Sequence, residues 1–348
     1  MEHIKSDTNS FDRFKSIKPQ SVRMPCGQLV KTGHLDDDER LPLVLRPDAE
    51  NVDLVEWAGR QRAFIEARLL EHGALLFRDF NLKPIPDFER FALALCPELF
   101  KDNGEHPRGA ISSNVYTPIF YPADRKVLWH NENSFNHRWP LKVWFGCIQP
   151  SLVGGETPLV DSRQVYALMD QDIREQFAAR QVMYVRNYGE GLGLDWQTVF
   201  KTAQRAEVEK LCGENFLEFE WKKNGGLKTR SVRPAVISHP KTGEMCWFTQ
   251  AQHWHTSCLD AATRKSLYSL YGEDDLPRAC YYGDGSRIED AVMDEILSVY
   301  ARLEVSFRWQ PRDILMLDNV LTAHARNPYA GERKLLVAMG EMRSYTEV

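Results

Sequence analysis

The sequence predicts a mainly β fold with peripheral helices, of the β-sandwich or jelly-roll type. From residue 126 onward, short apolar segments rich in β-branched and aromatic residues follow one another, and most are bounded by Gly, Pro, Asn or Asp. Helical patterns interrupt these segments without alternating with each of them, which is typical of sandwiches and jelly rolls and not of βαβ sheets. No GxGxxG motif follows a strand, so a dinucleotide-binding fold has no support.

The first part of the chain predicts two helices and a strand. Apolar residues at helical spacing run from near Asn51 to His72, and Gly73 is a typical helix stop. The continuous apolar run 74–77 then predicts a buried strand. A second amphipathic helix follows, whose apolar face is formed by Phe88, Phe91, Ala92 and Leu95.

Strands and helices share the rest of the chain. Strands are expected at 126–130, 141–148, 157–161, 182–188, 216–221, 233–239, 245–249, 305–309, 313–318 and 334–342. Helices are expected around 163–179, 195–213, 260–271 and 288–303. The Gly-rich stretch 189–193 lacks the Lys-Ser/Thr of a phosphate-binding loop, so we expect a flexible loop there.

Composition indicates a globular protein that acts on a small molecule. The 348 residues are 43% hydrophobic, which predicts one domain over 21–348 after a flexible polar arm over 1–20. With 44 basic and 49 acidic residues mixed along the chain, no basic field for nucleic acid exists. The absence of an apolar leader or an 18-residue apolar run predicts a cytoplasmic protein without a membrane span. The seven scattered cysteines predict reduced thiols. Oligomeric state stays open.

A candidate metal site begins at His130-Asn131-Glu132. The apolar residues 127–129 lead into it, and on an extended strand positions i and i+2 share a face, so both side chains could reach one ion. About one His-x-acid pair is expected by chance in such a chain. The other pair, His34 and Asp36, lies in a charged, turn-like stretch, and we interpret it as solvated surface.

A second histidine and an arginine complete the pattern. His324 lies 194 positions after His130 (324 − 130), and Arg333 follows nine residues later at the start of an apolar segment. Two histidines and one carboxylate leave three octahedral positions open, as in non-haem Fe(II) oxygenases. An arginine could bind the far carboxylate of a chelating cosubstrate with two hydrogen bonds.

Two other interpretations of the histidines are open. His253-Trp254-His255 offers a rival pair of donors, but no acid accompanies it, and we interpret it as structural. A zinc hydrolase could use the same triad as iron, although it would leave Arg333 without a purpose.

Five segments, in order, resemble the TauD/TfdA family of Fe(II)/2-oxoglutarate-dependent oxygenases, and within it the clavaminate-synthase-like branch of natural-product tailoring hydroxylases. The segments are HGALLFRDF (72–80), WHNENSF (129–135), PSLVGGETPLVDSRQVY (150–166), RSVRPAVISHPKTGEMCWFTQAQHWH (230–255) and DNVLTAHARNPYAGERKLL (318–336). The resemblance covers most of the chain and implies a double-stranded β-helix, a cupin-like jelly roll.

The resemblance also implies roles for individual residues. Iron would be bound by His130, Glu132 and His324, and 2-oxoglutarate by Arg333 and Thr157, with Arg326 a basic position near the site. Glu132 replaces the Asp of taurine dioxygenase itself, which is typical of the clavaminate-synthase-like branch and argues against taurine as substrate. A halogenase would carry Gly or Ala at this position, so the carboxylate favours oxygenation.

The implied reaction consumes O2 and 2-oxoglutarate, releases succinate and CO2, and hydroxylates an unactivated carbon. The branch implies antibiotic or other secondary-metabolite biosynthesis on an amino acid or a derived molecule, free or thioester-linked to a carrier protein; desaturation, epoxidation or cyclisation would use the same ligands. Asn133, Ser134 and Phe135, which follow the ligands, are expected to line the substrate pocket. The competing class is a non-catalytic β-sandwich that binds a partner such as a carrier domain.

Overall fold

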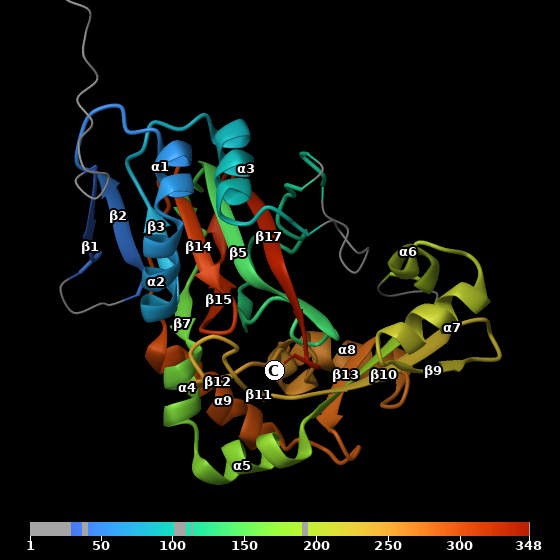
Figure 1. Cartoon of the computed structure of the whole chain (residues 1–348). Helices are drawn as coiled ribbons and strands as arrows, with labels where there is room; N and C mark the ends of the chain where they lie inside the picture. Colours follow the sequence, from blue (N-terminus) through green and yellow to red (C-terminus); the bar gives the residue numbers. More distant parts are fainter. Residues whose placement is uncertain (1–28, 37–40, 101–108, 113, 190–193, 348) are drawn as a thin grey trace, which may run out of the picture.

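Strands form the centre of the molecule and helices surround them, as predicted (Figure 1). The computed structural model describes residues 29–36, 41–100, 109–112, 114–189 and 194–347. The largest sheet has the strand order β1-β2-β3-β14-β5-β17, with bounds Val30–Gly33, Leu43–Pro47, Ala74–Phe77, Ile314–Asp318, Arg138–Gln149 and Lys334–Ser344. A three-stranded sheet has the order β4-β15-β7, with bounds Val127–His130, Thr322–Arg326 and Leu159–Asp161.

Smaller sheets and the helices complete the fold. A four-stranded sheet has the order β13-β8-β10-β9, with bounds Arg278–Tyr282, Val182–Tyr188, Leu227–Arg233 and Glu218–Trp221. Two strand pairs are β11 (Val236–Ser238) with β12 (Met245–Trp247) and β16 (Tyr329–Ala330) with β6 (Val153–Gly154). The α-helices α1 to α9 span Leu54–Arg60, Arg62–His72, Pro84–Leu95, Ser162–Leu168, Gln171–Arg180, Trp196–Phe200, Arg205–Glu214, Ala261–Tyr271 and Asp290–Leu303. Two short 3-10 helices are η2 (Ala251–His253) and η3 (Thr256–Cys258).

The largest sheet separates two parts of the core. On β3, Leu75 and Phe77 pack into one apolar cluster with residues of α1, α2 and α3, whereas Ala74 and Leu76 pack into a second cluster on the other side. This division follows from the two-residue period of a strand, whose successive side chains point to opposite faces. The second cluster includes Phe145, whose ring centroid lies 5.1 Å from that of His324. The largest sheet therefore packs against a residue of the candidate metal site.

Most predicted elements are confirmed, and the differences have local causes. Gly73 ends α2 in the left-handed region at φ 76°. The helix expected over 163–179 is two helices, because Asp170 caps a new one with its carboxylate. The strand expected at 305–309 is wrong: Val305 alone bridges Leu159. The helix expected over 195–213 is also divided, into α6 and α7.

Some sequence-based expectations concern parts that the structure does not describe. The arm over 1–20 and residues 190–193 of the Gly-rich stretch lie outside the described residues. A single domain over 21–348 stays a prediction. The six cysteines in the described part are free thiols, as expected. Among the described helices, none has the length and apolarity needed to cross a membrane.

An ion-pair cluster connects α2, β5 and β17. Lys142, 6% exposed, lies 2.6 Å from Glu66 and 2.9 Å from Glu341, and Lys241 contacts the same two acids at 2.6 and 2.8 Å. Burial alone would raise the pKa of Glu341, but hydrogen bonds from Lys241 and Lys142 outweigh it and lower that pKa to about 2. The carboxylate therefore stabilises the fold while it is ionised.

This cluster predicts acid-dependent stability. Because the pKa of Glu341 is lower in the folded than in the unfolded chain, its contribution is present above pH 4.5 and is lost as the pH falls toward 2. Glu341→Gln should reduce the free energy of unfolding at pH 7 by roughly 2–3 kcal/mol and by much less at pH 3. Urea unfolding at both pH values measures this. Glu56→Gln, which breaks an exposed pair with Arg60 on α1, is the control and should change little. Equal losses at both pH values for Glu341→Gln would contradict the expectation.

Candidate metal centre

Three side chains that lie far apart in the sequence meet at one point. Nε2 of His130 lies 3.7 Å, and Nε2 of His324 3.8 Å, from the same Oε2 atom of Glu132. One donor atom of each residue lies within 4.8 Å of the other two, and across the described ranges no other three His, Cys, Asp or Glu side chains do so. Glu132 and His324 are only 6% and 5% exposed. The structure therefore brings together the three donors expected from the sequence.

Sheet pairing explains why the two histidines meet. Strands β4 and β15 are antiparallel, and His130 lies directly opposite His324. Side chains of directly opposite residues point to the same face of a sheet, and the two ring centroids are 4.3 Å apart. On its other edge β15 pairs with β7, where His324 lies opposite Leu159. The strand that carries the second histidine is thus held on both sides.

Glu132 reaches the histidines from a turn. Strand β4 ends at His130, so the expectation that one extended strand carries both residues is wrong. The side chain of Asn319, which follows β14, holds the turn instead. Its Oδ1 accepts a hydrogen bond from the Glu132 backbone N–H at 2.6 Å, and its Nδ2 donates to the Glu132 carbonyl at 3.0 Å. The backbone on both sides of the carboxylate is therefore fixed.

Hydrogen bonds determine which ring nitrogen of His130 is available. Nδ1 of His130 lies 2.9 Å from the Leu128 carbonyl, so it carries the proton and Nε2 keeps its lone pair for an ion. His253 donates from Nε2 to the same carbonyl, also at 2.9 Å, and its ring packs against that of His130. Burial, and then the nearby His130, lowers the pKa of His253 to about 3, so it is neutral at pH 7.

The donor set fits Fe(II). Two imidazole nitrogens and one carboxylate oxygen, without a thiolate, are the facial triad of non-haem iron oxygenases, which leaves positions open for a chelating cosubstrate and oxygen. The separations of 3.7 and 3.8 Å are short enough for one ion to contact all three residues. A structural zinc site would need a fourth protein ligand, and the described part of the chain adds none to this group.

Arg333 lies directly before β17 and contacts Gly155 and Thr157. Its Nε donates to the Gly155 carbonyl at 2.9 Å, and its Nη2 lies 3.5 Å from the Thr157 hydroxyl. Within the described ranges no acidic side chain forms an ion pair with it. Burial, and then the charge of Arg326, lowers the pKa of Arg333 to about 10, so it remains charged at pH 7. A half-buried guanidinium without an acid partner in the described part could hold an anion, so the role of Arg333 in binding 2-oxoglutarate stays a prediction.

Gly155 allows the arginine to approach. Its φ of 75° lies in the left-handed region, and a Cβ there would stand 2.3 Å from Oγ of Ser151 and 3.0 Å from Cδ of Arg333. Any larger residue would therefore displace the guanidinium from its carbonyl partner.

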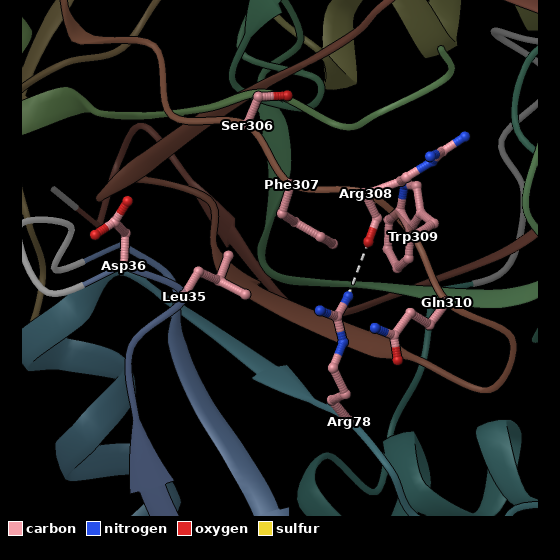
Figure 2. Close-up of a pocket in the computed structure, with 8 residues that line it drawn as sticks. All are labelled: Leu35, Asp36, Arg78, Ser306, Phe307, Arg308, Trp309 and Gln310. Carbon is pink, nitrogen blue, oxygen red and sulfur yellow. Dashed lines mark hydrogen bonds between the residues drawn. The ribbon is translucent and has the colours of Figure 1, made fainter. Parts of the chain in front are cut away.

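Trp309 orients the Thr157 hydroxyl. Its indole Nε1 donates to Oγ1 of Thr157 at 3.1 Å. Because that oxygen accepts from Trp309 and faces Arg333, its own proton is left to donate to an incoming carboxylate. The segment that carries Trp309 is held by Arg78, which donates to the Arg308 carbonyl at 2.9 Å (Figure 2). Arg78 also pairs with buried Asp313 at 2.6 Å. Side-chain hydrogen bonds of this kind hold the segment 305–309, which was expected to be a strand, in place of strand pairing.

Arg326 makes backbone contacts that the sequence did not predict. Its guanidinium donates to the backbone carbonyls of Tyr121, Pro122 and Arg125, and it lies over the rings of Tyr121 and Tyr329. It therefore holds the segment before β4 against β15. Contact with 2-oxoglutarate stays a prediction for Arg326, whereas its charge acts on Arg333 directly.

The three residues after Glu132 are buried. Asn133 adopts a left-handed φ of 59°. The Ser134 carbonyl accepts a hydrogen bond from the Tyr345 hydroxyl at 2.6 Å. Phe135 packs with Tyr184 and Trp254 in an apolar cluster. These contacts show that the three residues pack in the interior. Their contact with a substrate stays a prediction.

The rival histidines belong to other contacts. His34 and Asp36 are exposed and do not belong to the candidate metal-binding group, as expected. His255 contacts Ser257 through Nδ1 at 2.7 Å and the Ile288 carbonyl through Nε2 at 3.0 Å, so both its ring nitrogens are used. With His253 bound to Leu128, the structural interpretation of this pair is confirmed.

Sequence reasoning missed the residues that hold the site. Asn319 and Trp309 each act through hydrogen bonds to residues that lie far away in the sequence. The only available signal for Asn319 was a polar pair, Asp318-Asn319, at the end of an apolar run. No signal distinguished Trp309 from the other eight tryptophans.

Comparison with known proteins identifies the family. The family model described as taurine catabolism dioxygenase TauD, TfdA family, matches residues 39–339. The dapdiamide synthesis protein DdaC of Enterobacter agglomerans is 36% identical over 79% of this chain and 84% of its own length. A clavaminate synthase-like protein of Arabidopsis thaliana is 28% identical over 80% of this chain and 84% of its own length.

Solved structures share the fold. PvcB from Pseudomonas aeruginosa is 15% identical, has a TM-score of 0.54, and covers 92% of this chain and 94% of its own. It is described as an Fe, alpha-ketoglutarate dependent oxygenase from an isonitrile synthetic pathway. The predicted jelly-roll fold class is confirmed by this likeness.

Proposed function

Because this chain belongs to the TauD/TfdA family of Fe(II)/2-oxoglutarate-dependent dioxygenases, we propose that it oxidises an unactivated carbon of an amino acid or an amino-acid-derived intermediate in secondary-metabolite biosynthesis. The observation that carries the proposal is the meeting of His130, Glu132 and His324, together with a half-buried Arg333 that has no acid partner in the described part. The two relatives, one named for dapdiamide synthesis and one for clavaminate synthase, support the substrate class. A cytoplasmic location also stays a prediction.

One group of residues would bind the metal and a second group would bind the cosubstrate. His130, Glu132 and His324 would hold Fe(II), which when bound supplies the oxidative chemistry that couples 2-oxoglutarate decarboxylation to substrate oxidation. Arg333 and Thr157 would hold the far carboxylate of 2-oxoglutarate and so orient its other end toward the metal. Oriented binding of this kind lowers the barrier by fixing the reactants before the reaction.

Two experiments test the reaction and the substrate. Purified protein with Fe(II), 2-oxoglutarate and O2 should form succinate, faster when the correct amino-acid-derived substrate is present. Candidate substrates should be offered both free and as pantetheine thioesters, and products analysed for the mass of one added oxygen atom or the loss of two hydrogens. Hydrolysis of a peptide bond or an ester without formation of succinate would favour the zinc hydrolase. The absence of both turnover and metal binding would favour the non-catalytic binding protein.

Glu132 predicts oxygenation without halogenation. A carboxylate at this position occupies the coordination position on the metal that a halide would need, so chloride should not bind to the metal. Product analysis at high chloride concentration should show oxygenated or dehydrogenated product alone. Any chlorinated product from the unmodified protein would contradict the assignment of Glu132 as a ligand.

Trp309 predicts a smaller effect on the cosubstrate. Trp309→Phe keeps an aromatic ring but removes the N–H that orients Thr157, so 2-oxoglutarate affinity should fall by about 2- to 12-fold, the loss of one hydrogen bond. Thr157→Val should cause a similar loss. Combining the two changes should cost little more than Thr157→Val alone, because both remove the same contact. Additive losses would show that Trp309 acts by another route.

A further inference from the structure

A cavity that does not include the metal triad lies at the end of β10. A cavity of about 340 Å³ is lined there by Arg233, His137, Phe216, Val232 and Glu218 among others. Strand β9 stops opposite Arg230, so the last three residues of β10 have a partner strand on one side only. The cavity occupies the space beyond the end of β9.

Arg233 supplies the unusual feature of this cavity. It is only 4% exposed, and across the described ranges no carboxylate forms an ion pair with it. Its Nη atoms donate to the carbonyls of Val232 at 3.1 Å and Asn215 at 2.8 Å, while its Nε is buried without a hydrogen-bond partner. Burying a guanidinium without a counter-ion is costly, so an anion that entered the cavity would gain a strong partner.

The other charged groups leave Arg233 as the dominant charge. Arg230 is paired with Glu220 at 3.3 Å. Glu218 is exposed at the rim, where solvent screens it. Burial, and then the charges of Arg233 and Arg138, lowers the pKa of His137, so its ring is neutral at pH 7. The buried positive charge therefore faces the cavity without compensation.

Apolar walls limit the kind of anion. Phe216 is 61% exposed and adopts a left-handed φ of 52° just after α7, and its ring centroid lies 4.5 Å from that of His137. That position normally favours Gly or Asn, so a large exposed ring there is unfavourable for the helix end alone. Val232 is 38% exposed beside it. An inorganic ion would leave these surfaces in water, whereas an organic anion would cover them.

We propose that this cavity binds the carboxylate or phosphate group of an organic anion, with Arg233 as the group that contacts it. Two residues that line the cavity contact the segment that follows the metal ligand Glu132: Tyr345 donates to the Ser134 carbonyl, and Ser231 donates to the Phe135 carbonyl. The anion has two possible sources that rest on the proposed function: the carboxylate of a free amino-acid-derived substrate, or the phosphate of a carrier-bound pantetheine arm.

Calorimetric titration of the full-length protein with matched probes distinguishes these sources. N-acetyl-L-alanine and 4′-phosphopantetheine carry the anion, and N-acetyl-L-alaninamide and pantetheine lack it. We expect one anionic probe to bind at least tenfold more tightly than its neutral counterpart. Preference for N-acetyl-L-alanine indicates the carboxylate of a free substrate, and preference for 4′-phosphopantetheine indicates the phosphate of a carrier-bound arm. Equal affinities within both pairs, or no binding, would overturn the proposal.

Two variants assign the binding to Arg233. Arg233→Gln should reduce affinity for the anionic probe at least tenfold, whereas Arg302→Gln, which changes an exposed side chain of α9, should not change it. Because Arg233→Gln could impair folding, Val232→Glu provides a second test: it places a negative charge at the exposed wall and should weaken binding of the anion but not of the neutral probe. Unchanged affinity in Val232→Glu and in a folded Arg233→Gln would overturn the proposal. Iron and 2-oxoglutarate are absent from these titrations, so their outcome is independent of the proposed oxygenase function.

Discussion

Glu132→Ala should abolish Fe(II) binding and succinate formation while the protein stays folded. The change removes the only carboxylate of the triad and leaves two imidazoles, and we expect the affinity for Fe(II) to fall by more than about 100-fold, beyond the loss that is typical when a supporting residue is removed. The fold should persist because the turn is held by the backbone bonds to Asn319, which the substitution does not touch. His130→Ala should have the same effect on iron.

A matched variant separates this expectation from its rival. His34→Ala changes the other His-x-acid pair, whose histidine is exposed, and should leave iron binding and turnover as in the unmodified protein. Anaerobic Fe(II) titration, succinate assays and circular dichroism on the three variants measure metal binding, activity and fold. Inactive His34→Ala together with active His130→Ala would show that the metal lies at the other pair.

Arg333→Ala should weaken 2-oxoglutarate binding and leave iron binding nearly unchanged. Without the guanidinium, the far carboxylate of the cosubstrate would be unpaired in a shielded pocket, a loss of roughly 2–5 kcal/mol by analogy with other buried charge pairs. At about 1.4 kcal/mol for each tenfold change, affinity should fall by about 30-fold to several thousand-fold. The iron ligands are untouched, so Fe(II) affinity is the internal control.

Two further variants test the geometry of this anchor. Arg333→Lys should restore only part of the affinity, because an ammonium keeps the charge but cannot make the planar pair of hydrogen bonds. Arg326→Lys should have a smaller effect than Arg333→Ala, because Arg326 is bound to three backbone carbonyls. If Arg333→Ala bound 2-oxoglutarate normally and Arg326→Lys did not, the anchoring role would belong to Arg326.

The sequence allowed the site to be predicted because its ligands lie next to strong local patterns. His130 follows an apolar segment that forms β4, and Arg333 precedes one that forms β17. The strand around His324 was not among the expected strands, because the only apolar residues of its sequence, Thr-Ala-His-Ala-Arg, are two alanines, which are weak strand formers. Strand β15 forms because β4 and β7 pair with both its edges, a tertiary effect that no short segment reports.

The supporting contacts could not be predicted for a related reason. Asn319 holds Glu132 across 187 positions (319 − 132), and Trp309 holds Thr157 across 152 (309 − 157). Hydrogen bonds between such distant partners depend on how the sheets pack, whereas residue patterns report only local periodicity. The same limitation produced the incorrect strand at 305–309, which is apolar enough to be a strand but is held by the side chain of Arg78.

The most direct test of the central claim is the visible absorption of the protein with Fe(II) and 2-oxoglutarate under anaerobic conditions. If His130, Glu132 and His324 leave adjacent positions open on the metal and Arg333 anchors the cosubstrate, the chelate should give a weak charge-transfer band that saturates with 2-oxoglutarate. The band should be absent in Glu132→Ala and should require much more 2-oxoglutarate in Arg333→Ala. No band in the unmodified protein, with Fe(II) bound and 2-oxoglutarate in excess, would contradict the assignment.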